Sequence, residues 1–252
     1  MKLGCTSYVY PADIVSNVEK LADLVDDVEL LIFEGADEDS LPSAEEIDRL
    51  GELSGSGGFS YTVHLPLDID VCSKDRSFRS FSLRRAAQIA DLTSPLKPYG
   101  YVLHLPGGET AEAGWTDAAC AAGSEIFAAC GGNLFVENLS SYSFNRLEPV
   151  FERSPVRLCL DIAHAHKAGD DWREIYLALR DKTGIVHFYM HDPDSDRHLG
   201  FQDAPPGFVP GVTGVLLSSG YEGVLTIEMF GQEDFFLSKK IVDSEIERWG
   251  KR

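Results

Sequence analysis

Eight short apolar segments, rich in β-branched and aromatic residues, constrain the fold of this chain more than any other feature. They span residues 2–8, 28–34, 59–65, 99–105, 133–139, 156–162, 184–190 and 223–229. Their nearly continuous apolar character is typical of strands that are buried on both faces, as in a parallel sheet. Amphipathic patterns that favour helices alternate with them, at roughly 13–25, 43–54, 77–93, 115–130, 144–152, 170–181, 210–219 and 234–249.

This alternation predicts an α/β chain folded as one (β/α)₈ TIM barrel. Eight strand–helix units in 252 residues match the usual length of that fold. A doubly wound open sheet also alternates strands and helices, but eight evenly spaced units make it the weaker choice. No linker or low-complexity segment divides the chain, so we expect a single domain over residues 1–252.

Composition restricts the partners of the chain. The net charge of −19 repels phosphate backbones, so we expect no duplex nucleic acid as a partner. No run of about 18 apolar residues is present, so we expect no membrane span, and the polar start does not resemble a signal peptide. The five cysteines are scattered and never spaced as CxxC, which predicts reduced thiols in a cytoplasmic protein. The sequence allows an oligomer.

Polar side chains gather where the predicted strands end, which is where barrels of this kind carry their chemistry. Those at the ends of strands two to eight are Glu34, His64, His104, Glu137, Asp161, His187 and Glu228. Shortly beyond strand ends follow His164, His191, Asp196 and His198. A lone residue of this kind is more often structural, but barrel closure brings all of them to one mouth. Several carboxylates there would repel one another unless cations neutralised them.

Imidazoles mixed with carboxylates are the ligands of zinc, manganese, iron or cobalt, so we predict a site for divalent metal ions. The stretch LDIAHAH, residues 160–166, illustrates the pattern. Asp161 and His164 are spaced so that the last carboxylate of the strand and the first turn of the following loop reach the same cation. His166 is left either as a hydrogen-bond donor behind a ligand or as an exposed residue.

Substrate contacts are expected from residues around the same mouth. Arg76 and Arg79 lie in the basic segment 73–85 and are candidates for binding a substrate anion. Glu34 is assigned either to substrate hydroxyls or to a structural salt bridge. Phe201, in the long loop 198–211, would either cover a large planar ligand or pack on the barrel rim. Tyr8, after strand one, presents the same choice.

The order of strand-end residues resembles the xylose-isomerase-like barrel superfamily, which includes sugar isomerases, sugar epimerases and endonuclease IV-type nucleases. The one-metal isomerases and epimerases imply a ligand set of Glu137, Asp161, His187 and Glu228. The endonuclease IV branch implies three metals, Glu137 as the shared ligand, and five further ligands: His64, His104, His164, Asp196 and His198. These additional residues favour multi-metal cleavage of a phosphoester. Either His187 or His191 is the ligand of strand seven, because alternation places both on one face.

A narrower resemblance concerns four stretches: TSYVYPADIV at 6–15, TVHLPLD at 62–68, YVLHLP at 101–106 and GVLTIEMF at 223–230. They are similar to cobamide-remodelling enzymes, which cleave the nucleotide loop of corrinoids at its phosphoribosyl linkage. The resemblance implies a metal-dependent hydrolase for a small phosphorylated, nucleotide-like substrate, with Glu137 bridging metals.

Two alternatives remain open at this point. One is a sugar or sugar-phosphate isomerase or epimerase, in which one metal holds the substrate while Glu137 and Glu228 move a proton. The other is a binding protein without catalysis on a barrel scaffold, because fold alone does not separate these functions.

Overall fold

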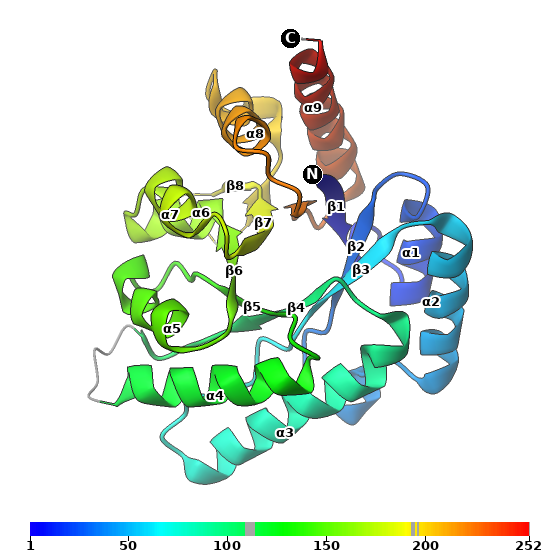
Figure 1. Ribbon diagram of the computed structural model, residues 1–252. Helices are drawn as coiled ribbons and strands as arrows, with labels where there is room; N and C mark the ends of the chain where they lie inside the picture. Colours follow the sequence, from blue (N-terminus) through cyan, green and yellow to red (C-terminus); the bar gives the residue numbers. More distant parts are fainter. Residues whose placement is uncertain (109–113, 193–194, 196, 252) are drawn as a thin grey trace.

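Eight parallel strands close into a barrel in the order β1-β10-β7-β6-β5-β4-β3-β2 (Figure 1). The computed structural model describes residues 1–108, 114–192, 195 and 197–251. The strands are β1 Lys2–Thr6, β2 Asp27–Leu31, β3 Ser60–His64, β4 Gly100–His104, β5 Leu134–Glu137, β6 Arg157–Asp161, β7 Thr183–Phe188 and β10 Val224–Ile227. The predicted (β/α)₈ barrel is confirmed.

Helices surround this barrel on the outside (Figure 1). They are α1 Ile14–Leu21, α2 Ala44–Gly57, α3 Arg76–Thr93, α4 Trp115–Ala129, α5 Glu148–Arg153, α6 Ile162–Ala168, α7 Trp172–Leu179, α8 Phe208–Ser218 and α9 Gln232–Gly250. Short 3₁₀ turns are η1 Glu38–Ser40, η2 Ser94–Leu96, η4 Phe144–Arg146 and η5 Phe201–Asp203. No helix within the described ranges is long and apolar enough to cross a membrane.

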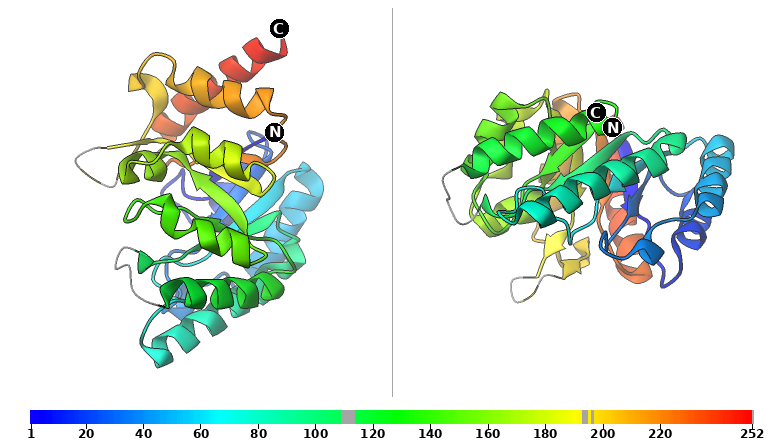
Figure 2. Two further views of the ribbon diagram at one scale, coloured as in Figure 1. Left: turned by 60° about the vertical axis from the view of Figure 1, so that its left-hand side comes forward. Right: turned by 90° about the horizontal axis from the view of Figure 1, so that it is seen from below.

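Two elements differ from the expectation from sequence. A loop was expected after β6, but α6 begins at the next residue, and Asp161 caps it by accepting the backbone N–H of His164. After β7, a two-stranded antiparallel sheet forms between β8 Met190–His191 and β9 His198–Leu199. Figure 2 shows this yellow segment projecting from the body of the barrel. Both elements are too short to give a clear periodic pattern in the sequence.

An apolar layer fills the barrel interior below the mouth. It consists of Val102, Phe135, Cys159 and Ile185, which form their own buried cluster from four adjacent strands. Side chains alternate along a strand, so the residues two positions later point into the same interior, one layer closer to the mouth. Those residues are His104, Glu137, Asp161 and His187. The period of the strands therefore delivers four polar side chains to one place.

Small residues make room for this layer. A Cβ atom on Gly100 would lie 2.2 Å from the ring of Phe135, and one on Gly184 would lie 2.3 Å from the same ring. The barrel accommodates Phe135 at its centre only because both neighbours lack a side chain.

Candidate metal centre

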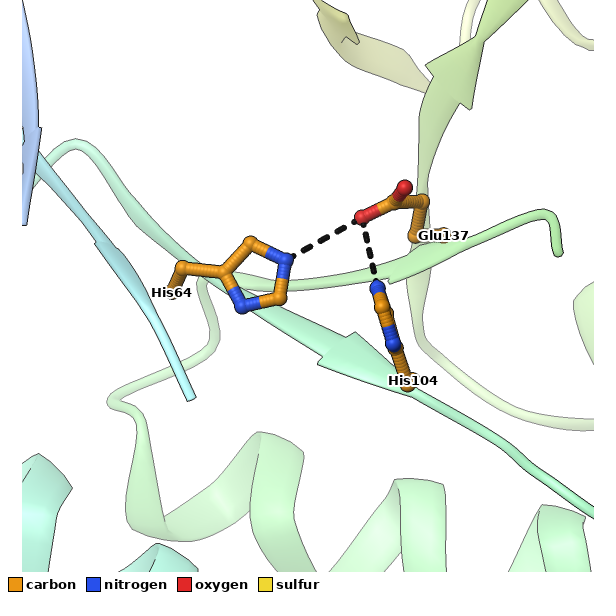
Figure 3. Close-up of side chains that lie close together, drawn as sticks. All are labelled: His64, His104 and Glu137. Atoms are coloured by element: carbon orange, nitrogen blue, oxygen red, sulfur yellow. Dashed lines mark hydrogen bonds and ion pairs between the residues drawn. The ribbon is translucent and has the colours of Figure 1, made fainter. Parts of the chain in front are cut away.

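The carboxylate of Glu137, at the end of β5, is the centre of the site. His64 from β3 and His104 from β4 both place Nε2 against its Oε2 atom, at 3.2 and 3.0 Å (Figure 3). The ring of His64 is held from behind, because its Nδ1 lies 2.8 Å from the carbonyl oxygen of Leu65. These three residues present ligand atoms that all lie within 4.8 Å of one another.

A second set of donors faces the other oxygen of the same carboxylate. The Nδ1 atom of His164 lies 3.1 Å from Oε1 of Glu137 and 3.2 Å from Oδ2 of Asp161. Asn138 fixes the backbone here, since its side chain exchanges hydrogen bonds of 2.8 and 2.9 Å with the N–H and C=O of Asp161. Glu137 thus belongs to both of these groups of possible ligands, and it belongs to a third with Cys159 and His187.

His187, at the centre of the third group, is fully buried. Its Nδ1 atom lies 3.5 Å from a carboxylate oxygen of Glu137 and 3.5 Å from one of Glu228. Its Nε2 atom lies 3.0 Å from Oε2 of Glu29, in β2. Glu29, His187 and Glu228 also form a group that could hold an ion, as do Glu137, Cys159 and His187.

Three buried atoms of the donor groups, Oε1 of Glu29, Oδ2 of Asp161 and Nδ1 of His187, make no hydrogen bond of good geometry among the described residues. Buried polar atoms in folded proteins are almost always paired, and an ion is one accepted explanation of an exception. The residues present therefore fit a divalent cation, because hard carboxylate and borderline imidazole donors converge with lone pairs unused.

Protonation shifts reflect the crowding of charge. Burial raises the pKa of Glu228 to about 8, and the negative charges of Glu137 and Asp161 add to the effect. Burial likewise raises the pKa of Asp161 to about 6. Burial acts in the same direction on Glu137, but the neighbouring imidazoles of His104 and His187 outweigh it and hold the pKa of Glu137 well below its usual range.

The pKa values of the imidazoles are shifted by the same burial and the same neighbouring charges. Burial by itself lowers the pKa of His164, but Asp161 and Glu137 more than reverse this and raise it to about 10. Burial lowers the pKa of His198 to about 4. Without a cation the cluster therefore holds protons where a metal would otherwise sit, since bound protons and bound cations relieve the same repulsion.

His198 lies at the edge of the cluster and His191 lies apart from it. The Nδ1 atom of His198 is 2.9 Å from the backbone oxygen of Glu228 and 3.7 Å from its carboxylate, and the ring stacks on Tyr189 at 3.6 Å. His191 instead meets the ring of His166 edge-on, at 5.9 Å. Between the two strand-seven candidates, the geometry therefore favours His187. Asp196 lies outside the described residues.

Of the expected substrate contacts, four lie away from the donor cluster. Glu34 is exposed and lies beyond the end of β2 at Leu31. Arg76 is exposed in the first turn of α3, and Arg79 donates to the backbone oxygen of Ser73. Phe201 is buried and packs on Phe188 with ring centroids 4.3 Å apart, as the packing alternative predicts.

Sequence reasoning missed Glu29. The apolar pattern predicts a strand from Val28 to Glu34, whereas β2 spans Asp27–Leu31. With those bounds, alternation places Asp27, Glu29 and Leu31 on the inner face. An acidic residue in the middle of a buried strand was the available signal, because such a charge needs a partner.

An apolar wall borders the donor cluster on one side. Phe33, Leu67 and Phe230 line the same cavity of about 270 Å³ as His64, His104, Glu137, His164, His198 and Glu228. Tyr8 extends the wall, because its ring meets Phe33 at 5.1 Å and Phe230 at 6.5 Å. All four side chains are exposed, Tyr8 by 48%. Aromatic side chains left open beside a polar centre are typical of a ligand site.

A second cavity, of about 290 Å³, opens on the other side of the cluster. It shares His104, His164 and His198 with the first. Its remaining lining is polar and in part cationic: Ser140, Ser141, Lys167, Tyr189, His191, Ser195 and Arg197, with Leu139. The mouth of the barrel therefore has an aromatic side and a hydroxyl-rich, basic side.

Several solved structures share the fold over the whole chain. A D-tagatose 3-epimerase-like protein aligns with a TM-score of 0.83 at 21% identity, covering 100% of this chain and 99% of the other. Endonuclease IV from Thermus thermophilus aligns with a TM-score of 0.76 at 18% identity, covering 98% and 100%. A D-psicose 3-epimerase with D-fructose aligns with a TM-score of 0.73 at 15% identity, covering 98% and 97%.

No curated protein matches the sequence significantly. Residues 18–251 match the family described as Xylose isomerase-like TIM barrel. That match spans most of the chain and agrees with the closed eight-stranded barrel. The chain therefore belongs to the xylose isomerase-like TIM barrel family.

Proposed function

We propose that this protein is a metal-dependent hydrolase that cleaves a phosphoester in a small, nucleotide-like substrate. One observation carries the proposal: the two oxygens of Glu137 face different donor groups, His64 with His104 on one side and His164 with Asp161 on the other. A carboxylate placed in this way could be a ligand of two cations. Paired cations are suited to displacement at phosphorus, because attacking and leaving oxygens both need stabilisation.

When bound, divalent cations supply Lewis-acid polarisation of the phosphoryl group and acidify water. Within the chain, His64, His104, Glu137, Asp161, His164, His187 and Glu228 would hold them, and His198 completes the rim. Glu228 is buried and lies on the cavity wall. We assign it the movement of a proton to or from the reacting oxygens.

The walls of the mouth support a substrate with two unlike parts. Aromatic side chains at Phe33, Phe230 and Tyr8 offer stacking surfaces for a planar group. On the opposite side, Lys167 and Arg197 provide positive charge for a phosphate in a chain that is otherwise strongly acidic. A cobamide, whose nucleotide loop joins a base, a ribose and a phosphate, has this character, and the sequence resemblance to cobamide-remodelling enzymes points the same way.

The direct test is turnover of a cobamide by the purified protein with added zinc, manganese or cobalt. We expect a change in visible absorbance and a product mass that corresponds to hydrolysis of the nucleotide loop. Glu137→Gln should abolish turnover. Bound metal should amount to two or three ions per chain, and His104→Ala should lower that number while the barrel remains folded. One ion in the wild type, with no cleavage of any phosphodiester tested, would contradict the proposal.

The second candidate is a sugar or sugar-phosphate isomerase or epimerase, and the structural comparisons support it better than they support the first. Several similar solved structures are sugar 3-epimerases. Glu137 and Glu228 flank His187 at equal distances of 3.5 Å, and Asp161 completes a four-ligand set for a single cation. Two carboxylates beside one ion would suit the removal and return of a proton next to a carbonyl.

Hydrogen exchange separates the two candidates. An epimerase would exchange a carbon-bound hydrogen of D-fructose or D-tagatose with deuterated water, which NMR detects directly. We expect no such exchange from a phosphoester hydrolase. Exchange into the sugar together with one bound ion per chain would establish the second candidate and exclude the first.

A further inference from the structure

Glu29 and His187 form a buried pair directly beneath the metal centre. Both residues have an exposed fraction of 0%, and they come from strands far apart in the chain. Oε2 of Glu29 and Nε2 of His187 are separated by 3.0 Å. Isolated charges in such surroundings are costly, so a pair of this kind is retained only where each partner compensates the other.

The pair determines which ring nitrogen of His187 faces the mouth. An ionised carboxylate only accepts hydrogen bonds, so Nε2 must carry the hydrogen that it donates to Glu29. In the neutral ring, Nδ1 then has a free lone pair. This atom is buried, has no hydrogen-bond partner in the described part of the chain, and lies 3.5 Å from both Glu137 and Glu228.

We propose that Glu29 is the positioning residue of the metal centre: it fixes the tautomer and orientation of His187 so that Nδ1 binds the cation. The inference rests on the metal centre of the proposed function, and it holds for both candidate reactions because His187 belongs to both ligand sets. Ligand histidines commonly donate their second N–H to a carboxylate, and loss of that carboxylate weakens metal binding by about 10–100-fold.

The same strand supplies a matched control. Asp27 lies two residues before Glu29 on the same inner face and is also fully buried. Its carboxylate is paired with the hydroxyl of Ser60 at 2.5 Å, and among the described residues it belongs to none of the groups of possible metal ligands. Asp27→Asn therefore alters a buried carboxyl group of β2 without removing support from His187.

The experiment measures cobalt and zinc binding by Glu29→Gln, Glu29→Ala, Asp27→Asn and the wild type. Dissociation constants come from competition with a chromophoric chelator, and the visible absorption of bound cobalt reports ligand geometry. Circular dichroism confirms that each variant is folded. We expect about 10–100-fold weaker binding and an altered cobalt spectrum in Glu29→Ala. Asp27→Asn should bind and absorb as the wild type does.

Glu29→Gln keeps the shape of the side chain and an oxygen acceptor but removes the negative charge. It therefore tests the inference even if Glu29→Ala does not fold. It should weaken cobalt binding by at least several-fold relative to Asp27→Asn. A folded Glu29→Gln with the wild-type dissociation constant and spectrum would overturn the inference. Failure of the phosphoesterase proposal looks different, because the wild type would still bind metal in a Glu29-dependent manner but would not cleave phosphodiesters.

Discussion

At the scale of single residues, Glu137 shows how much one side chain organises. Three imidazoles from β3, β4 and α6 lie within 3.2 Å of its two oxygens. The carboxylate is buried, and its neighbours keep its pKa low, so it is ionised at neutral pH. A fixed negative charge surrounded by imidazole nitrogens is a strong attractor for a divalent cation.

His187 and His191 provide a direct test of the ligand assignment. In His187→Asn, we expect cobalt or zinc affinity to fall by more than about tenfold, because a ligand is lost. The matched change His191→Asn should leave affinity unchanged, since His191 lies against His166 and outside the donor groups found among the described residues. Isothermal titration of both folded variants measures the difference. An intact affinity in His187→Asn would mean that strand seven contributes no ligand through this residue.

Some residues of the site could be predicted from the sequence, and others could not. His64, His104, Glu137 and Asp161 each end a strand, so the pattern of apolar runs located them without a structure. Glu29 was not located, because a strand end shifted by three residues drew attention to Glu34 instead. Boundaries are the weakest part of a sequence interpretation, and a shift of an odd number of residues moves side chains to the opposite face.

At the scale of elements, the turn from β6 into α6 brings a carboxylate and an imidazole together. Asp161 ends the strand and caps the helix, which places His164 one turn later beside the same centre. The spacing Asp-x-x-His predicted this meeting, although the helix itself was expected to be a loop. Seven residues with only one apolar face provide too little periodicity to reveal a helix.

Phe201, in η5, was expected either to pack on the barrel rim or to cover a ligand, and a substitution can distinguish these two roles. Phe201 is buried against Phe188, so Phe201→Ala should lower the free energy of unfolding by about 3–5 kcal/mol. Its effect on the Michaelis constant should be small. Phe236→Ala is the control, because that side chain is 42% exposed and its loss should cost no more than about 0.5 kcal/mol. Urea denaturation measures both; equal stabilities would contradict the packing role.

At the scale of the whole molecule, binding of a cation at the candidate metal centre is coupled to the release of protons. Without a cation, Glu228 and Asp161 have pKa values raised to about 8 and about 6, and His164 has one raised to about 10. All three groups therefore hold protons over at least part of the range between pH 6 and pH 8. A cation must displace those protons, so its affinity should rise as the pH rises.

This linkage predicts the results of two measurements. Adding zinc to the metal-free protein at pH 7 in weak buffer should release protons, which an indicator dye detects. The metal should also stabilise the fold by about 2.7 kcal/mol at one hundred times the dissociation constant. At a fixed zinc concentration, the resulting rise in melting temperature should be larger at pH 8 than at pH 5.5. Glu137→Gln is the control and should show a much smaller rise at both pH values. An equal rise at both pH values in the wild type would contradict the linkage.

The barrel itself followed from the sequence because strand spacing and apolar character are global properties, repeated eight times. The β8–β9 pair did not, because two strands of two residues each depend on tertiary contacts and not on local preference. The chemical identity of the substrate lies in the loops around the mouth, where sequence patterns carry the least structural information.

The shared carboxylate of Glu137 has an evolutionary consequence. Its two oxygens serve separate neighbourhoods, and His64 and His104 occupy only one of them. Replacing those two histidines would leave only His187 beside that oxygen and would leave the other neighbourhood complete. In the two-cation centre that we propose, two substitutions would therefore be enough to change the number of ions held, so catalytic repertoires built on this barrel would diverge faster than its architecture.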